Sequence, residues 1–311
     1  MKSMLKFIKK EAVLCISLML ALISMVFVLP DSTYISYIDF HTLTILFSLM
    51  VIMSGLRSLG IFSMIGSWML KKTSNVRSLS IVLILLCFGF SMFITNDVAL
   101  ITFVPFTIDV LVMAALEKYL IRIIVLETIA SNLGSMLTPI GNPQNLYLFS
   151  LSGMGLGDFI SLMLPYTLIS LVGLLAACVI LIDKKSVEEK VQLQSTLTEA
   201  GKKKTIVYLL LFLFALTSVI RIISVYVVGL VILVVVFLID RKILRKPDYA
   251  LLFTFVFLFV FIGNMKRIPQ INFWLRGIIQ GNELITSVLA SQVISNVPAA
   301  ILLSGFTDNI S

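Results

Sequence analysis

The stretch TPIGNPQN, residues 138–145, lies inside an apolar run that extends from about residue 123 to residue 150. Its two prolines and the glycine between them cannot continue a regular helix. A second polar stretch, SNLGS at residues 131–135, precedes it in the same run. Broken backbone at membrane depth is tolerated only where protein or a polar cavity satisfies its polar groups. The pattern therefore predicts a discontinuous helix over residues 123–150 of an all-α polytopic membrane protein.

The composition supports a membrane protein. The chain has 311 residues, of which 59% are hydrophobic and 13% are charged, and its mean hydropathy is +1.09. Soluble domains carry roughly a quarter charged residues, so a water-soluble globule, a disordered chain and a nucleic-acid-binding protein are excluded. The 24 Lys and Arg outnumber the 16 acids. They gather in short loops, which indicates control of membrane orientation rather than a polyanion-binding face.

Residues that commonly carry catalysis or bind cofactors are scarce. His41 is the single histidine, and Cys15, Cys87 and Cys178 all lie in apolar runs. No zinc-binding, nucleotide-binding or nucleophile motif is present, so no cofactor is expected and a membrane-embedded enzyme is disfavoured.

Apolar runs and charges divide the chain into four parts. Residues 1–37 form an N-terminal transmembrane helix and an external loop, with a cleaved signal peptide as the alternative. Lysines before this helix place the N-terminus in the cytoplasm, at the cytoplasmic membrane. Residues 38–182 form a first repeat, residues 183–204 a cytoplasmic linker, and residues 205–311 a second repeat. Residues 61–70, too short to span, predict a helix in the membrane interface.

A polar tip, Thr95-Asn96-Asp97, separates two apolar runs within the first repeat. Basic residues flank the pair at both outer ends. A re-entrant hairpin fits this pattern, and two full spans joined by an external turn fit the charges equally well.

The tip recurs later in the chain. ITNDVALI at residues 94–101 matches ISNVPAAI at residues 294–301, and each is followed at the same distance by a phenylalanine. The span ending at Gly55 is predicted to run inward and the one ending at Gly263 outward, which predicts inverted repeats. A counterpart of the broken helix would fall beyond Ser311, so the second repeat, with its tip at 295–296, is expected to be incomplete. A non-transporting fragment is therefore one interpretation.

These three motifs together, around residues 95–100, 138–146 and 295–300, resemble the ion-transporter superfamily. This group includes citrate-transporter-like permeases, divalent-anion/sodium symporters and arsenite permeases. The resemblance extends from about residue 40 onward, and the Gly-Asn-Pro-Gln-Asn stretch is its most specific part. It implies an inverted-repeat transporter with re-entrant hairpins and broken helices.

The resemblance also implies site residues. A first cation site, for Na⁺, would use Thr95, Asn96, Ser131, Asn132, Gly141 and Asn142. A second cation site would use Ser295 and Asn296. The residues implied for the substrate are Thr95, Asn96, Asp97, Asn142, Pro143, Asn145, Ser295 and Asn296.

Asp97 stands where the symporters carry threonine, which is closer to the arsenite-permease pattern. Asp97 is either a functional acid or the N-cap of a helix beginning at Val98. Glu127 is either a coupling acid, on the face of Ser131, or an interfacial partner of Arg122. Asn142 and Asn145 are either site residues or loop caps.

The predicted function is secondary active transport of a small di- or tricarboxylate-like anion, coupled to Na⁺ or H⁺, by alternating access. Arsenite or metalloid-oxyanion efflux and Na⁺/H⁺ exchange are the alternatives within this class. The expected partners are the anionic substrate and membrane lipid, with no nucleic acid, and a homodimer is one compatible arrangement.

Overall fold

The computed structural model describes residues 11–61, 64, 73, 75–186, 199–294 and 296–307. This part of the chain folds into helices joined by turns, without a β-sheet. It divides into two compact units. The terminal unit comprises Met1–Phe47, Tyr147–Gly153 and Pro247–Ser311, and the central unit comprises Ser48–Leu146 and Met154–Lys246.

Helix lengths confirm the predicted all-α polytopic class. A membrane span needs about 20 predominantly apolar residues. Within the described part of the chain, four helices are long and apolar enough to cross a membrane: α4 (Phe40–Ser58), α6 (Val76–Ile94), α10 (Leu156–Leu181) and α13 (Tyr249–Arg267). The apolar helices α2 (Ala12–Phe27), α12 (Val225–Asp240) and α15 (Glu283–Ile294) are shorter.

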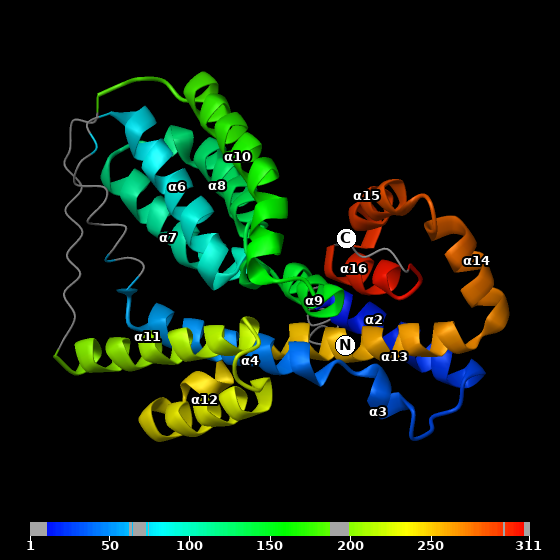
Figure 1. Cartoon of the computed structure of the whole chain (residues 1–311). Helices are drawn as coiled ribbons and strands as arrows, with labels where there is room; N and C mark the ends of the chain where they lie inside the picture. Colours follow the sequence, from blue (N-terminus) through cyan, green and yellow to red (C-terminus); the bar gives the residue numbers. More distant parts are fainter. Residues whose placement is uncertain are drawn as a thin grey trace, which may run out of the picture. The chain divides into compact units, whose positions relative to one another are not determined.

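The core of the central unit lies between α6, α7 (Asn96–Met113) and α8 (Leu120–Ser135), with α10 against α6 and α8. Figure 1 shows these helices side by side. Buried apolar side chains fill their interfaces: Leu79, Leu83 and Cys87 of α6, Phe103 and Leu111 of α7, and Ile123 of α8. Gly134 of α8 lies against α6, where a Cβ would overlap the Phe88 carbonyl. The missing side chain lets the two backbones approach closely.

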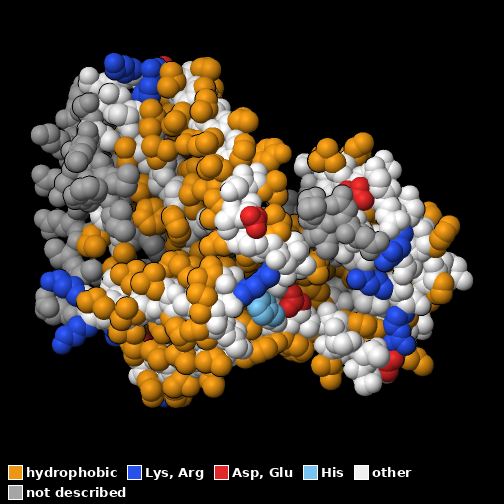
Figure 2. All heavy atoms as spheres, viewed as in Figure 1, with side chains coloured by type: hydrophobic (Ala, Val, Ile, Leu, Met, Phe, Trp, Pro, Cys, Tyr) orange, Lys and Arg blue, Asp and Glu red, His pale blue; other side chains and the backbone are white. Residues whose placement is uncertain are grey.

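The outer surface of the central unit is apolar. Helix α10 keeps few side chains buried, and leucine, isoleucine and valine side chains project from it along its whole length. Helix α11 (Glu199–Val219) and α12 present similar surfaces, which Figure 2 shows as continuous hydrophobic areas. Contiguous apolar surface of this extent on a helix that long is typical of contact with lipid.

Helices α11 and α12 form a pair that turns at Arg221, where φ is 61°. Helix α11 starts at Glu199, earlier than the predicted start at Thr205. At the open end of the pair, Lys204 Nζ lies 3.5 Å from Asp240 Oδ2. The turn η3 (Ile243–Arg245) follows α12 directly.

Helix α2 packs along α13 in the terminal unit. The α2 face that is buried there consists of Ser17, Ala21 and Ser24, and small residues of this kind allow close helix contacts in membranes. Asn264 of α13 donates hydrogen bonds of 2.9 Å to Ser24 Oγ and to the hydroxyl of Tyr34, which begins the short helix α3 (Tyr34–Tyr37). A polar cross-link therefore fixes α2, α3 and α13 together.

Two further helices of the terminal unit, α14 (Pro269–Ile279) and α16 (Asn296–Ser304), follow α13, with α15 between them. Helix α16 packs against α13 and α15.

Some predictions fall on residues outside the described part. These are the lysines of residues 1–10, most of the interfacial segment 61–70, linker residues 187–198 and Ser295.

Candidate functional site

The hairpin between α6 and α7 turns at a single residue, Thr95, with φ of 70° and ψ of 149°. A positive φ is uncommon for a residue other than glycine and persists where the surrounding structure enforces it. The Thr95 hydroxyl accepts a hydrogen bond of 3.5 Å from the Val98 N–H. Thr95 thus ends α6 and caps the N-terminus of α7.

Asp97 lies in the first turn of α7 and is exposed. The interpretation of Asp97 as the N-cap of a helix beginning at Val98 is wrong, because α7 begins at Asn96 and its cap is Thr95. A carboxylate in this first turn interacts favourably with the partial positive charge of the helix N-terminus. A functional role of Asp97 stays a prediction.

Two predicted site residues of α8 contact the hairpin tip. Ser131 Oγ donates a hydrogen bond of 2.7 Å to the Asn96 carbonyl, and Asn96 Nδ2 donates one of 3.1 Å to Asn132 Oδ1. The Asn96 side-chain oxygen, in contrast, is buried and has no hydrogen-bond partner among the described residues. The hairpin tip therefore presents one buried amide oxygen that is available to a ligand.

The break in the predicted 123–150 helix follows α8, which continues without interruption through the polar stretch 131–135. The chain leaves α8 at Ser135, forms the turn η2 (Pro139–Gly141) and begins α9 (Pro143–Ser152). This confirms the discontinuity, and proline at the first position of α9 suits a helix start because that position needs no amide donor.

The side chain of Asn142 forms hydrogen bonds to both sides of this break. Its side chain is 4% exposed, and its Nδ2 lies 3.2 Å from Ser135 Oγ, while its Oδ1 accepts a hydrogen bond of 2.8 Å from the Asn145 N–H. Asn145 Nδ2 in turn donates to the carbonyls of Met136, at 3.1 Å, and Thr138, at 3.4 Å. Both amides thus satisfy backbone groups that the break frees, so they serve as caps in this structure.

Gly141 is required by the geometry of the same break. A Cβ at this position would overlap the carbonyl group of Ser135. The Thr138 hydroxyl also donates a hydrogen bond to the Met92 carbonyl of α6. The loop is therefore folded back tightly on the ends of α8 and α6.

The hairpin tip and the η2–α9 loop contact neighbouring positions of α8. Ser131 contacts the hairpin tip and Ser135 contacts the η2–α9 loop, and residues four apart lie on one helix face about 6 Å apart. We call this region of the central unit the polar junction; it consists of Thr95, Asn96, Ser131, Asn132, Ser135, Gly141, Asn142 and Asn145. The structure thus brings together the residues predicted for the first cation site.

The second predicted tip lies in the terminal unit. Ser295 is outside the described residues, and Asn296 is the first residue of α16, with an exposed side chain. The roles predicted for both residues stay predictions.

Glu127 of α8 occupies a buried position that the sequence only partly indicated. Its side chain is 0% exposed and accepts a hydrogen bond from the hydroxyl of Thr107 in α7. The Glu127 Oε2 atom has no hydrogen-bond partner among the described residues. The predicted pairing with Arg122 is wrong, because Arg122 Nη1 donates to the Leu181 carbonyl at 3.2 Å.

Comparison with known proteins agrees with this architecture. The chain is 34% identical over 276 residues to an uncharacterized transporter of Methanocaldococcus jannaschii, covering 88% of this chain and 73% of the relative. It is 31% identical over 273 residues to an inner membrane protein of Escherichia coli, covering 86% and 72%. A 46 kDa membrane protein of Mycobacterium leprae is 26% identical over 287 residues.

The family described as Citrate transporter matches residues 4–310, nearly the whole chain. The match agrees with the apolar spans of the chain. The chain is therefore a multi-pass membrane transporter and belongs to the citrate transporter family.

Proposed function

We propose that this chain carries a small carboxylate anion across the cytoplasmic membrane by secondary active transport, coupled to Na⁺ or H⁺. The observation that supports this most directly is the polar junction. Two helix breaks and a set of neutral oxygen-bearing side chains lie together in an otherwise apolar helical unit. Broken helices of this kind supply carbonyl groups to cations and helix N-termini to anions in secondary transporters.

The cation would bind at Asn96, with Ser131, Asn132 and the Gly141–Asn142 loop around it. These groups offer neutral oxygen atoms, and a weakly held cation can leave such a site as well as enter it. The buried, unpartnered oxygen of Asn96 is the atom that gains most from a cation, because a buried polar atom without a partner costs about 1–3 kcal/mol. The anion would face the N-terminus of α9, which begins at Pro143 and has no acid in its first turn.

Alternating access would use two inverted repeats. Gly55 of α4 lies against the ring of Tyr208, and Gly263 of α13 lies against the ring of Tyr37. Both glycines end an apolar span and precede a short segment and a hairpin in the sequence. This shared packing supports the repeat, in which Ser295 and Asn296 would form the second tip.

A thermal-stability measurement on the purified chain tests the proposal. We would compare Na⁺ with choline at fixed pH, and pH 6 with pH 8, in the presence of citrate, succinate, phosphate or arsenite. A ligand at about 100 times its dissociation constant stabilises the folded state by about 2.7 kcal/mol. We expect citrate or succinate to raise the melting temperature. Coupling to Na⁺ would limit this rise to samples that contain Na⁺, and coupling to H⁺ would limit it to one of the two pH values.

Asn96→Ala is the decisive variant. It removes the unpartnered oxygen and the exposed hydrogen bond to Asn132, while Ser131 still holds the tip through the Asn96 carbonyl. We expect the ligand-dependent shift to vanish with the unliganded melting temperature nearly unchanged. Gln270→Ala, an exposed amide on α14, is the control. A ligand-dependent shift that survives in Asn96→Ala would refute the proposed site.

Metalloid-oxyanion efflux is the second candidate, favoured by the exposed carboxylate of Asp97 at the hairpin tip. In the same experiment, a shift with arsenite alone would select it over carboxylate transport.

A further inference from the structure

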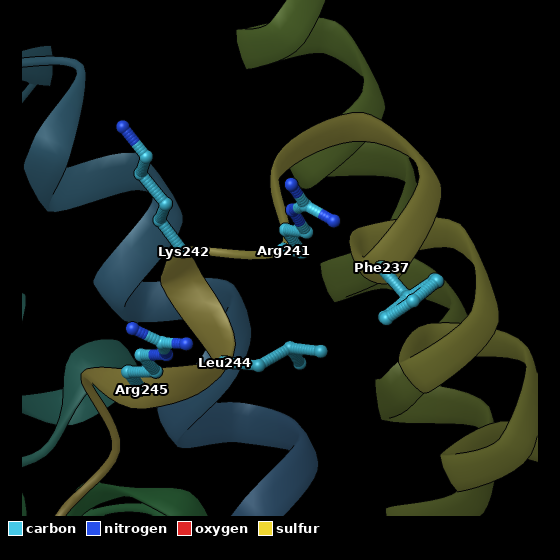
Figure 3. A pocket seen from close by; sticks show the side chains of 5 residues that line it. All are labelled: Phe237, Arg241, Lys242, Leu244 and Arg245. Carbon is cyan, nitrogen blue, oxygen red and sulfur yellow. The ribbon is translucent and has the colours of Figure 1, made fainter.

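A basic hollow lies at the end of α12, away from the polar junction in the sequence. Its lining consists of Phe237, Arg241, Lys242, Leu244 and Arg245, and its volume is about 600 Å³. Figure 3 shows Leu244 reaching from the turn after α12 toward Phe237, with the charged ends of the three basic side chains around the turn. Apolar and cationic groups therefore line one hollow.

The positive charge of this hollow is not neutralised by its own side chains. Asp240, the neighbouring acid, is engaged by Lys204 at 3.5 Å. Arg241, Lys242 and Arg245 are exposed and form no ion pair with another described residue. Three full charges exceed the partial negative charge of about one half that a helix C-terminus contributes. An anion would therefore find a net positive site.

The apolar side of the hollow continues onto a lipid-facing helix. Phe237 is 56% exposed and Leu238 is 77% exposed. A second hollow, of about 510 Å³, shares Phe237, Arg241 and Lys242 with the first. A ligand that carries a phosphate group and a hydrocarbon chain matches both sides, whereas free phosphate would leave the apolar side uncovered.

We propose that this hollow binds the headgroup of an anionic phospholipid. The guanidinium groups of Arg241 and Arg245 would hold the phosphate oxygens, because arginine matches phosphate geometry with paired donors. Lys242 would add a third charge, and an acyl chain would lie along Phe237 and Leu238. The proposal is independent of which substrate the polar junction takes.

Native mass spectrometry of the purified full chain tests this inference. The protein would be titrated with phosphatidylglycerol or with phosphatidylcholine in matched detergent, and separately with inorganic phosphate. The test variant is Arg241→Gln/Lys242→Gln/Arg245→Gln. The control is Lys184→Gln/Lys185→Gln/Lys203→Gln, which removes the same charge from other exposed positions. Circular dichroism and size-exclusion chromatography check that both variants are folded.

We expect the wild-type chain and the control to retain phosphatidylglycerol in preference to phosphatidylcholine. Each cation near an anionic lipid is worth about five-fold in affinity, so the test variant should lose roughly 100-fold. Phe237→Ala should weaken lipid retention without introducing any charge change. Equal losses in the test and control variants would overturn the inference, as would equal retention of both lipids. Displacement of the lipid by free phosphate would also overturn it, since the site would then recognise the ion alone.

Discussion

The hydroxyl of Thr107 donates a hydrogen bond to the carboxyl group of Glu127, and this buried contact ties α7 to α8 one turn before Ser131. The two helices carry the two halves of the polar junction. A cross-link at this position therefore controls how firmly the hairpin tip is held against the broken helix.

Glu127→Gln should be tolerated, because the amide oxygen can still accept the Thr107 hydrogen bond. Glu127→Ala should be destabilising, since the Thr107 hydroxyl then loses a buried partner at a cost of about 1–3 kcal/mol. The measurement is the melting temperature of each purified variant in one detergent.

Thr107→Ser and Thr107→Val are the matched pair for this contact. Serine keeps the hydroxyl and should stay near wild type, while valine should lower the melting temperature. Adding Glu127→Ala to Thr107→Val should cost less than the sum of the two single changes, because the contact can be lost only once. Additive losses would show that the two side chains do not act through each other.

Gly141→Ala should destabilise the chain strongly. The added Cβ would overlap the backbone of Ser135 rather than a movable side chain, and overpacking of this kind costs about 1–3 kcal/mol. Gly173→Ala is the control, because the Cβ of that residue in α10 would meet open space. Alanine there should be neutral or stabilising by up to about 1 kcal/mol. A Gly141→Ala chain as stable as Gly173→Ala would contradict the tight loop.

Gly55→Ala and Gly263→Ala should both lower the melting temperature, because each new methyl group meets a tyrosine ring. Gly55→Ala/Tyr208→Ala and Gly263→Ala/Tyr37→Ala should each lose less stability than the sum of their single changes, because the overlap disappears with the ring. Gly89→Ala, where the added Cβ meets nothing, should leave the melting temperature unchanged. Additive losses in both double variants would argue against the shared packing of the two repeats.

Stability should also depend on pH through Asp31, in the loop after α2. The Thr33 hydroxyl and then the Arg267 guanidinium, 2.8 Å away, hold the pKa of Asp31 below its usual value of 3.8. A carboxyl group with a lowered pKa stabilises the folded state above its unfolded pKa, and the contribution is lost as the pH falls through the folded value. Thermal unfolding between pH 6 and pH 3 should show this loss in wild type. Asp31→Asn should remove that part of the dependence, and an unchanged profile would exclude Asp31 as its source.

The sequence predicted the helices and their breaks well because each depends on local properties. The length of the apolar runs indicates helices α6, α10 and α13, and the prolines and glycine indicate the break at residues 139–143. The polar junction was predictable because its residue types are rare inside apolar runs, and the family resemblance indicated which of them meet.

The partners of individual side chains were less predictable, because they depend on tertiary contacts. Asp97 suits an N-cap by residue type, yet the turn at Thr95 makes the helix begin two residues earlier than such a cap requires. Arg122 lies near Glu127 in the sequence, but its guanidinium group donates a hydrogen bond to the carbonyl group of Leu181, far along the chain. No local pattern encodes either outcome.

The packing of α2 against α13 has a consequence for how the protein is made. Ser24 and Asn264 belong to helices that leave the ribosome at very different times. Until α13 has been made, the small-residue face of α2 lacks the helix against which it packs in the folded unit. A nascent chain that ends before Tyr249 therefore carries an α2 without this partner, and the contact can form only after α13 has been translated.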